Sequence, residues 1–304
     1  MHPAPGSTTG MPYCVEDPDA LTFARNAWGF IARDPVRDNV LGTLVEAGCA
    51  GDGRAESRWI RVLGGGGTGG GLLGVAVCTP PHGALLSDLP EAAAHAIAAH
   101  VAGTLARISS VNGPPAAAAA FAHRYAGLIG AGVRLGSEQR LFRLERLAPP
   151  SGVAGRGRAA TPTDRERVRA WVDAFSAELT PDHAARPEHT EHDEAIDRRF
   201  AHGGLMWFWE VEGVPVSFAW RTPLAPPNRW PRTTVIRVSA VYTPPEHRGQ
   251  GYASANVAAV SQRALDAGAS GCMLYTDATN QTSNKIYQRI GYRPVGAAQK
   301  WDFT

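Results

Sequence analysis

The sequence predicts an α+β fold with mixed sheets, arranged in two domains. The chain has 304 residues, about twice the length of an average domain. Residues 149–157 are rich in Pro, Ser and Gly and lack helical or strand periodicity, which indicates a linker. We therefore expect domains at residues 1–148 and 158–304, each a mixed, mostly antiparallel twisted sheet flanked by helices.

The segment after the linker begins with a helix and a hairpin. Apolar residues recur at helical intervals over 165–179. Two aromatic-rich runs, 204–210 and 214–220, surround an acidic turn at Glu212-Gly213. This pattern is typical of a β-hairpin.

A strand, a glycine turn and a second helix follow the hairpin. The strand-like run 234–242 leads into the turn at 248–253, and the helix beyond it ends at Gly268. We then expect a strand, a short helix and two final strands, at 272–276, 283–290, 291–295 and 299–303.

The two halves of the chain echo each other in sequence. Trp59–Val62 resembles Trp207–Val211, and Gly132–Leu135 resembles Gly291–Pro294. The echoes keep the same order at offsets of about 140 to 160 residues, which is one domain length. This predicts a tandem duplication, with chance similarity as the alternative.

Composition argues against several classes of function. The net charge is only +2, so the chain has no single-sign field for nucleic acid or a membrane. No apolar run approaches about 18 residues, and the first residues lack the pattern of a signal peptide. We expect a soluble cytoplasmic protein with no metal site, because its cysteines are scattered: Cys14, Cys49, Cys78 and Cys272.

The turn Arg248–Ala253 lies between a β-branched strand and an amphipathic helix. Glycines let its backbone N–H groups converge at the positive end of the helix dipole, which suits a pyrophosphate. Neither Gly-x-Gly-x-x-Gly nor Gly-Lys-Ser/Thr is present. The turn alone leaves a purely structural turn and a dinucleotide site as alternatives.

The turn and its flanks resemble a known signature. Val238–Ala253 is similar to the acyl-CoA motif of the GNAT superfamily of N-acetyltransferases, Gln/Arg-x-x-Gly-x-Gly/Ala, with Arg248, Gly251 and Ala253 at the specified positions. A second motif of that family resembles 274–295, where an Asn precedes a Tyr by seven residues and a Gly-aromatic pair follows. The resemblance covers about residues 156 to 304.

The resemblance implies direct transfer of an acetyl group from acetyl-CoA to a primary amine of a small molecule or a peptide. Tyr287 would be the general acid for the departing thiolate, since a phenol with a pKa of about 10 is protonated at neutral pH. An N–H near Val241 would stabilise the oxyanion. The implied cofactor contacts are main-chain groups together with Asn280: Ala240, Val241, Tyr242, Arg248, Gly249, Gln250, Gly251, Tyr252, Ala253 and Asn280.

The sequence departs from the family pattern at the general base. Related enzymes often carry a Glu where this chain has Tyr275. The carboxylates of Asp277, Glu246 and Glu210 are candidates, and proton transfer through water is the alternative. The base stays unassigned.

Aromatic residues follow neighbouring strands. Trp207 and Trp209 alternate and so share a face, with Trp220, Tyr242 and Tyr275 on adjacent strands. Packing under a helix is one interpretation. The other is that Trp207, Trp209, Trp220 or Tyr275 lines an acceptor pocket.

The run 182–194 is acidic and contains histidines, but it lacks a compact ligand set. A solvated loop or helix is the simplest interpretation, and Glu188, Glu191 and Asp193 would attract a cationic amine. The glycine-rich stretch 64–71 lacks a Lys-Ser/Thr pair and is expected to be a hairpin loop.

The first half carries no equivalent of the glycine turn or of the Asn280–Tyr287 pair. We therefore expect a degenerate N-terminal GNAT-like domain that does not bind the cofactor. Two other functions stay open for the chain: an acyl-CoA sensor or interaction module, and a domain that acts on acyl-thioesters by decarboxylation or S-acyl transfer.

Overall fold

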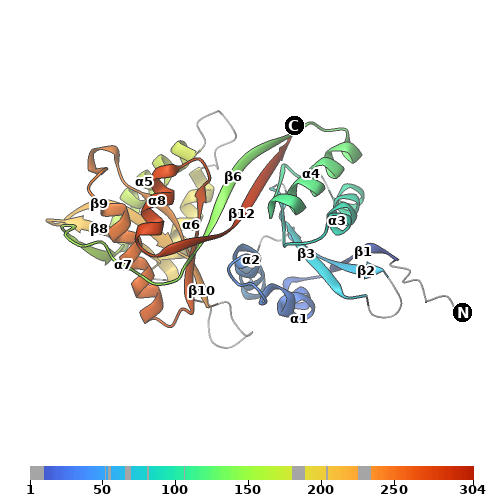
Figure 1. The fold of residues 1–304 in the computed structure, drawn as a ribbon, viewed down its shortest axis with the longest axis horizontal. Coiled ribbons are helices and arrows are strands. Elements are labelled where there is room, and N and C mark those ends of the chain that lie inside the picture. The colour runs from blue at the N-terminus through green and yellow to red at the C-terminus, as the bar shows by residue number, and fades with distance from the viewer. Residues whose placement is uncertain are drawn as a thin grey trace, which may run out of the picture. The chain divides into compact units, whose positions relative to one another are not determined.

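The chain forms two compact units. Unit 1 contains Met1–Leu141, Asp277–Thr279 and Gly296–Thr304, and unit 2 contains Phe142–Thr276 and Asn280–Val295. The computed structural model (Figure 1) describes residues 10–51, 53, 56–65, 70–80, 82–105, 107–179, 189–202, 205–224 and 234–304.

Unit 1 has the strand order β1-β2-β3-β4-β5-β12-β6. The pair β4–β5 is parallel, and the pairs β1–β2, β2–β3, β3–β4 and β5–β12 are antiparallel. Its elements are β1 (Gly10–Asp17), α1 (Ala20–Ile31), α2 (Asn39–Ala50), β2 (Arg58–Gly65), β3 (Leu72–Cys78), β4 (Ala84–Leu86), α3 (Glu91–Thr104), β5 (Ser110–Gly113), α4 (Pro115–Ile129) and β6 (Val133–Leu144).

Unit 2 has the strand order β7-β8-β9-β10-β11-β6-β12. The pair β10–β11 is parallel, and β7–β8, β8–β9 and β9–β10 are antiparallel. Its elements are β7 (Arg156–Ala159), η1 (Pro162–Asp164), α5 (Arg165–Leu179), α6 (His189–His202), β8 (Met206–Val211), β9 (Val214–Arg221), β10 (Val235–Tyr242), η2 (Pro245–His247), α7 (Tyr252–Asp266), β11 (Gly271–Asp277), α8 (Gln281–Arg289) and β12 (Tyr292–Phe303).

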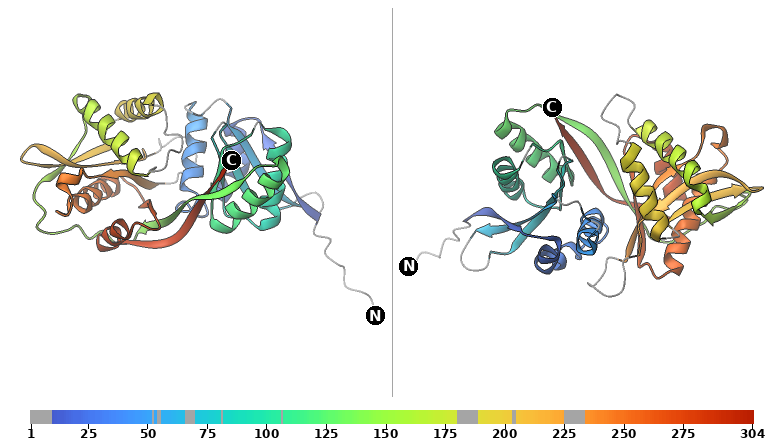
Figure 2. Two further views of the ribbon diagram at one scale, coloured as in Figure 1. Left: turned by 90° about the horizontal axis from the view of Figure 1, so that it is seen from above. Right: turned by 180° about the vertical axis from the view of Figure 1, so that it is seen from behind.

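Each sheet is covered on both faces. In unit 2, α5 and α6 pack on one face through Val168, Val172 and Ile196, and α7 and α8 pack on the other through Val257 and Tyr287. Figure 2 shows the yellow-green helices and the orange helix on opposite sides of the strands. In unit 1, α3 and α4 share one core with β2 to β5. On the other face of that sheet, Phe23 of α1 packs against Trp59 at 5.5 Å between ring centroids.

The two units repeat one order of elements: a strand, two helices, three strands, a helix, a strand, a helix and a strand. Their strand orders match as well, except that β12 precedes β6 in the order of unit 1 and follows β6 in that of unit 2. The echoing segments fall on corresponding strands, β2 with β8 and β6 with β12. Trp59 faces α1 whereas Trp207 packs on the α7 face, so the echo aligns strands and not individual side chains.

Several predicted elements are present in unit 2. The helix at 165–179 is α5, the hairpin is β8–β9 with its turn at Glu212-Gly213, and the strand before the glycine turn is β10. The glycine-rich stretch joins the paired strands β2 and β3, and residues 66–69 of it lie outside the described residues.

The prediction of two final strands is wrong. Residues 292–303 form the single strand β12, which continues through Gly296 and the two alanines after it. Small residues suggested a break, but pairing with β5 from Gln299 to Asp302 keeps this segment extended. Residues 296–304 therefore belong to unit 1, and the end of the expected linker, Arg156-Gly157, is part of β7.

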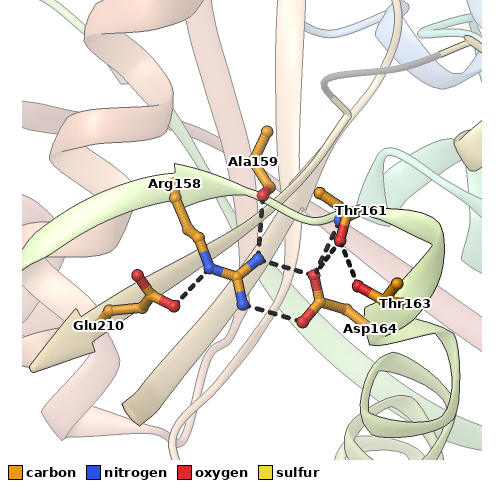
Figure 3. A network of polar contacts seen from close by, with 6 residues as sticks. All are labelled: Arg158, Ala159, Thr161, Thr163, Asp164 and Glu210. Atoms are coloured by element: carbon orange, nitrogen blue, oxygen red, sulfur yellow. Dashed lines mark hydrogen bonds and ion pairs between the residues drawn. The ribbon is translucent and has the colours of Figure 1, made fainter. Parts of the chain in front are cut away.

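A partly buried ion network joins the first two strands of unit 2 to η1, which leads into its first helix (Figure 3). The Arg158 guanidinium donates to both carboxylate oxygens of Asp164, at 2.7 and 2.9 Å, and also to Glu210. Asp164 in turn accepts the backbone N–H of Thr161 at 2.8 Å, which caps the start of α5. The hydrogen bonds to Asp164 and then to Glu210 raise the pKa of Arg158, although burial opposes this shift. The hydrogen bonds from Arg158 and then from Thr161 lower the pKa of Asp164 to about 2, again against the effect of burial.

Unit 1 has a corresponding network with the charges exchanged. Asp17 of β1 accepts two hydrogen bonds from Arg61 of β2, at 2.7 and 2.9 Å, and one from Asn26 of α1 at 2.9 Å. The Asp17 side chain is 4% exposed, so this ion pair is buried. In each unit, one arginine and its carboxylate partner thus connect the first two strands to the start of the helical segment that follows the first strand.

Candidate active site

β10 carries a bulge at its carboxyl end. Ser239 lies opposite Trp220 and Tyr242 opposite Phe218, so β10 has one residue more than β9 between these pairs. The bulge places Ala240 at a φ of 47°, a backbone conformation that is energetically costly for residues other than Gly. Ser217 holds the strand beyond the bulge, because its buried hydroxyl donates to the Tyr242 carbonyl at 3.2 Å.

β10 and β11 separate at the bulge. Their parallel register runs from Val235 opposite Gly271 to Val238 opposite Leu274. β10 continues for four more residues, through the expected cofactor contacts Ala240, Val241 and Tyr242. Bulges are common next to active sites, where they interrupt strand pairing and so leave main-chain groups available to a ligand.

The glycine turn leads directly into α7. Gly249 and Gly251 have φ angles of 79° and 82°, which L side chains rarely adopt. Gly251 is the N-cap of α7, so no side chain caps the first N–H groups of the helix. A Cβ on Gly249 would meet no atom within 4 Å, and one on Gly251 would lie 3.1 Å from Val153. The turn therefore presents exposed amides at the positive end of a helix, the geometry that binds a phosphate.

Side chains beside the turn are held by the protein itself. Arg248 donates from Nε to the Thr243 carbonyl at 2.9 Å and pairs with Glu178 of α5. Both partners of that pair are about half exposed, at 48% and 49%, so an anionic ligand can compete for the guanidinium. Gln250 accepts a hydrogen bond from the Tyr252 hydroxyl at 2.8 Å, and Ala253 lies in the first turn of α7.

Tyr287 lies on α8 inside the core of unit 2. Its ring packs 6.4 Å from Phe142 and 6.2 Å from Tyr292, between centroids, and the residue is 7% exposed. Burial raises the pKa of Tyr287, so the hydroxyl keeps its proton at neutral pH.

Asn280 is the N-cap of α8. Its side-chain oxygen accepts the backbone N–H of Ser283 at 3.0 Å, and the residue is exposed. The amide oxygen is thus used by the helix, which leaves the NH₂ group as the part suited to a cofactor.

The four aromatic residues considered for an acceptor pocket do not lie on one face. Trp207 packs on the α7 face, where Arg263 lies 5.6 Å from its ring, and Trp209 donates to the Ala154 carbonyl. Trp220 packs on the opposite face with Phe218, because Ala219 occupies the position across from Trp207. Tyr275 shares that opposite face, since alternation along β11 separates it from Leu274 in the α7 core.

The candidate bases are engaged elsewhere or lie in turns. Glu210 is buried and pairs with Arg158, so it is not available for proton transfer. Asp277 accepts the backbone N–H and the hydroxyl of Thr279, at 2.7 and 2.6 Å. Glu246 is exposed in the short 3₁₀ helix before the glycine turn. Glu188 and the side chain of Glu191 lie outside the described residues, and Asp193 pairs with Arg165.

We next consider possible metal ligands and cysteines in the described parts of the chain. No group of three or more His, Cys, Asp or Glu side chains there could hold a metal ion. None of the four cysteines, all of which lie among the described residues, forms a disulfide, and burial raises the pKa of Cys14 and Cys272 to about 11. Of the described helices, none has both the length and the apolar content needed to cross a membrane.

Two arginines of this region were missed from the sequence. Arg199 of α6 lies over the Trp220 ring, and Arg237 interrupts the apolar run Val235–Val238 of β10. A charged residue in the centre of a β-branched strand is a usable sequence signal. Its partner on α6 could not be found in this way, because 38 positions separate the two residues in the chain.

Comparison with known proteins agrees with this geometry. Residues 168–292 match the acetyltransferase (GNAT) family. The matched residues include the bulge, the glycine turn and Tyr287.

A curated protein is also similar in sequence to this chain. A mycothiol acetyltransferase of Paenarthrobacter aurescens (strain TC1) is 25% identical over 166 residues, which cover 52% of this chain and 50% of that protein. The alignment thus spans about half the length of this curated relative.

Solved structures share the fold over nearly the whole chain. A GNAT-family acetyltransferase from Colwellia psychrerythraea has a TM-score of 0.54 and 12% identity, covering 97% of this chain and 100% of that one. A GCN5-related N-acetyltransferase from Sphaerobacter thermophilus has a TM-score of 0.55 and 13% identity, covering 95% and 94%.

Proposed function

We propose that this protein transfers an acetyl group from acetyl-CoA to a primary amine of a small molecule or a peptide. The observation that carries the proposal is the β10 bulge followed by the exposed glycine turn at the start of α7. Acetyl-CoA supplies an activated thioester, and the match of residues 168–292 to the acetyltransferase (GNAT) family supports its use here.

Each element has a stated task in this proposal. The amides from Arg248 to Ala253 bind the pyrophosphate, and main-chain groups of Ala240 to Tyr242 orient the pantetheine arm. An N–H near Val241 stabilises negative charge that develops on the carbonyl oxygen. The Tyr287 hydroxyl holds a proton in the core and donates it to the leaving thiolate.

We further propose that the two units arose by tandem duplication and that unit 2 alone binds the cofactor. The identical element order and the matching strand orders support a duplication. In unit 1, the turn between β4 and α3 has no glycine, which supports the loss of the cofactor site there.

The substitution Tyr287→Phe tests the assignment of the general acid. It removes only the hydroxyl, so we expect kcat to fall at least about 100-fold while the Kd for acetyl-CoA changes less than about twofold. Steady-state kinetics with thiol detection and calorimetric titration of CoA measure the two quantities.

A matched control is Tyr292→Phe. Its hydroxyl lies in the same core and shares a 2.7 Å hydrogen bond with Ser261. This variant should lose about 1 kcal/mol of stability and keep its turnover. Equal turnover of Tyr287→Phe and the wild type would remove Tyr287 from the mechanism. Tight CoA binding without turnover of any amine would favour the sensor function instead.

A further inference from the structure

Two arginines approach the bulge from the face of unit 2 that α5 and α6 cover. Arg237 lies two residues before Ser239 on β10, so both side chains point to the same face. Ser239 pairs with Trp220, which therefore lies on that face as well. The guanidinium carbon of Arg199 lies 3.9 Å from the centre of the Trp220 ring.

Both arginines of this face are partly buried. Burial, and then the nearby charge of Arg237, lower the pKa of Arg199 to about 10. Burial also lowers the pKa of Arg237. An anion bound beside Arg199 would offset the free-energy cost of burying its charge.

Carboxylates on the same helix do not neutralise Arg199. Its Nη1 donates to the Ala195 carbonyl at 2.9 Å, and its buried Nε has no acceptor among the residues that the structure describes. The described carboxylates of α6 pair with other arginines: Asp193 with Arg165 and Arg169, Glu194 with Arg198, and Asp197 with Arg165.

We propose that the acceptor amine also carries an oxyanion group, a carboxylate or a phosphate, which binds Arg199 and Arg237 while the nitrogen faces the bulge at Ala240. The inference rests on the proposed acetyl transfer and defines its acceptor class. Guanidinium groups bind both oxyanions through paired, charge-assisted hydrogen bonds. Arg237 and Ala240 are three residues apart, so the amine and the anion would be separated by about 10 Å or less.

The test compares amines that differ only in charge. β-Alanine is paired with β-alaninamide, and O-phosphoethanolamine with ethanolamine, each assayed with acetyl-CoA by thiol release. We expect kcat/KM to be at least about tenfold higher for an anionic member, because hydrogen bonds to charged groups are strong. The two pairs separate carboxylate from phosphate recognition.

Substitutions of the two arginines test whether they cause the preference for anionic amines. Arg199→Met and Arg237→Met should each reduce the preference at least about tenfold and leave the KM for acetyl-CoA unchanged. Arg199→Lys keeps the charge and should retain part of the preference. The matched control is Arg221→Met, which also removes a buried Nε without a partner among the described residues, but on the opposite face of β9.

Equal use of the neutral and anionic amines would overturn this inference and leave acetyl transfer intact. A preference that survives in folded Arg199→Met and Arg237→Met would overturn it too, with thermal unfolding as the check on folding. If no amine, charged or neutral, releases thiol although acetyl-CoA binds, then the proposed transfer itself fails.

Discussion

The turns after the fourth strand of each unit follow the same framework but are built differently. In unit 1, residues 87–90 connect β4 to α3, and in unit 2, residues 243–251 connect β10 to α7. Ser87 is fully buried and its hydroxyl accepts the Val75 N–H at 2.9 Å. Leu89 packs so closely on Gly74 that a Cβ there would lie 2.6 Å from it.

The two turns differ in how their main-chain N–H groups are used. In unit 1 the Ser87 N–H donates to the Val75 carbonyl at 3.0 Å, so the turn extends the sheet. The carboxylates of Asp88 and Glu91 flank the start of α3, where they would repel a phosphate. In unit 2 the longer turn is exposed and contains two glycines with positive φ. The shared framework thus folds the chain, and under the proposed function the turn decides whether a unit binds the cofactor.

The ion networks are the shared part of the comparison, and Arg158→Met would break one of them. The change leaves Asp164 and the nearly buried Glu210 without their cation, so we expect unit 2 to lose about 3 kcal/mol. Hydrogen exchange, followed separately in β8 and β2, measures the stability of each unit.

The matched variant is Arg61→Met, which should lower protection in β2 by a similar amount and spare β8. Unchanged protection of β8 in Arg158→Met would show that its network does not hold unit 2 together. Equal losses in both units from either variant would contradict independent networks.

Low pH should weaken the ion network of unit 2 by protonating Asp164. Asp164 has a pKa of about 2 in the folded chain against an ordinary value of 3.8, so its contribution is complete above pH 4. It is lost as the pH falls through 2, which should cost unit 2 about 1–2 kcal/mol once solvent screening is included. Acid unfolding monitored in unit 2 measures this loss. Arg158→Met should lack this step, and an identical acid profile in both proteins would contradict the assignment.

The substitution Gly249→Val tests the glycine turn, which is present in unit 2 and has no equivalent between β4 and α3 of unit 1. The φ of 79° disfavours a side chain, and the new methyl groups would occupy the open side of the turn, so we expect the Kd for CoA to rise at least about tenfold. Gly130→Val is the control, because Gly130 has a φ of 64° and equally open surroundings at the end of α4 in unit 1. Calorimetric titration should detect a change for Gly249→Val alone. Equal affinities in both variants would separate the turn from binding.

Much of unit 2 could be predicted from local patterns. The helix at 165–179, the hairpin and the glycine turn each leave a signature within about 20 residues, set by periodicity and turn chemistry. The segments around Tyr287 and the turn could likewise be assigned from two short motifs.

Features that depend on distant pairing could not be predicted. Strand β12 stays continuous because it pairs with Ser110–Gly113, far away in the sequence. The division of Trp207 and Trp220 between two faces depends on the register of β8 and β9. The proximity of Arg199 to Trp220 requires α6 to pack over the sheet, and no local pattern encodes that contact.

The central claim is that the cofactor binds at the glycine turn of unit 2 and at no corresponding turn of unit 1. Hydrogen exchange of the whole chain with and without CoA tests this directly. We predict slower exchange at residues 240–242 and 248–254, and unchanged exchange at 87–94. Protection at 87–94, or none at 248–254 under saturating CoA, would contradict the claim.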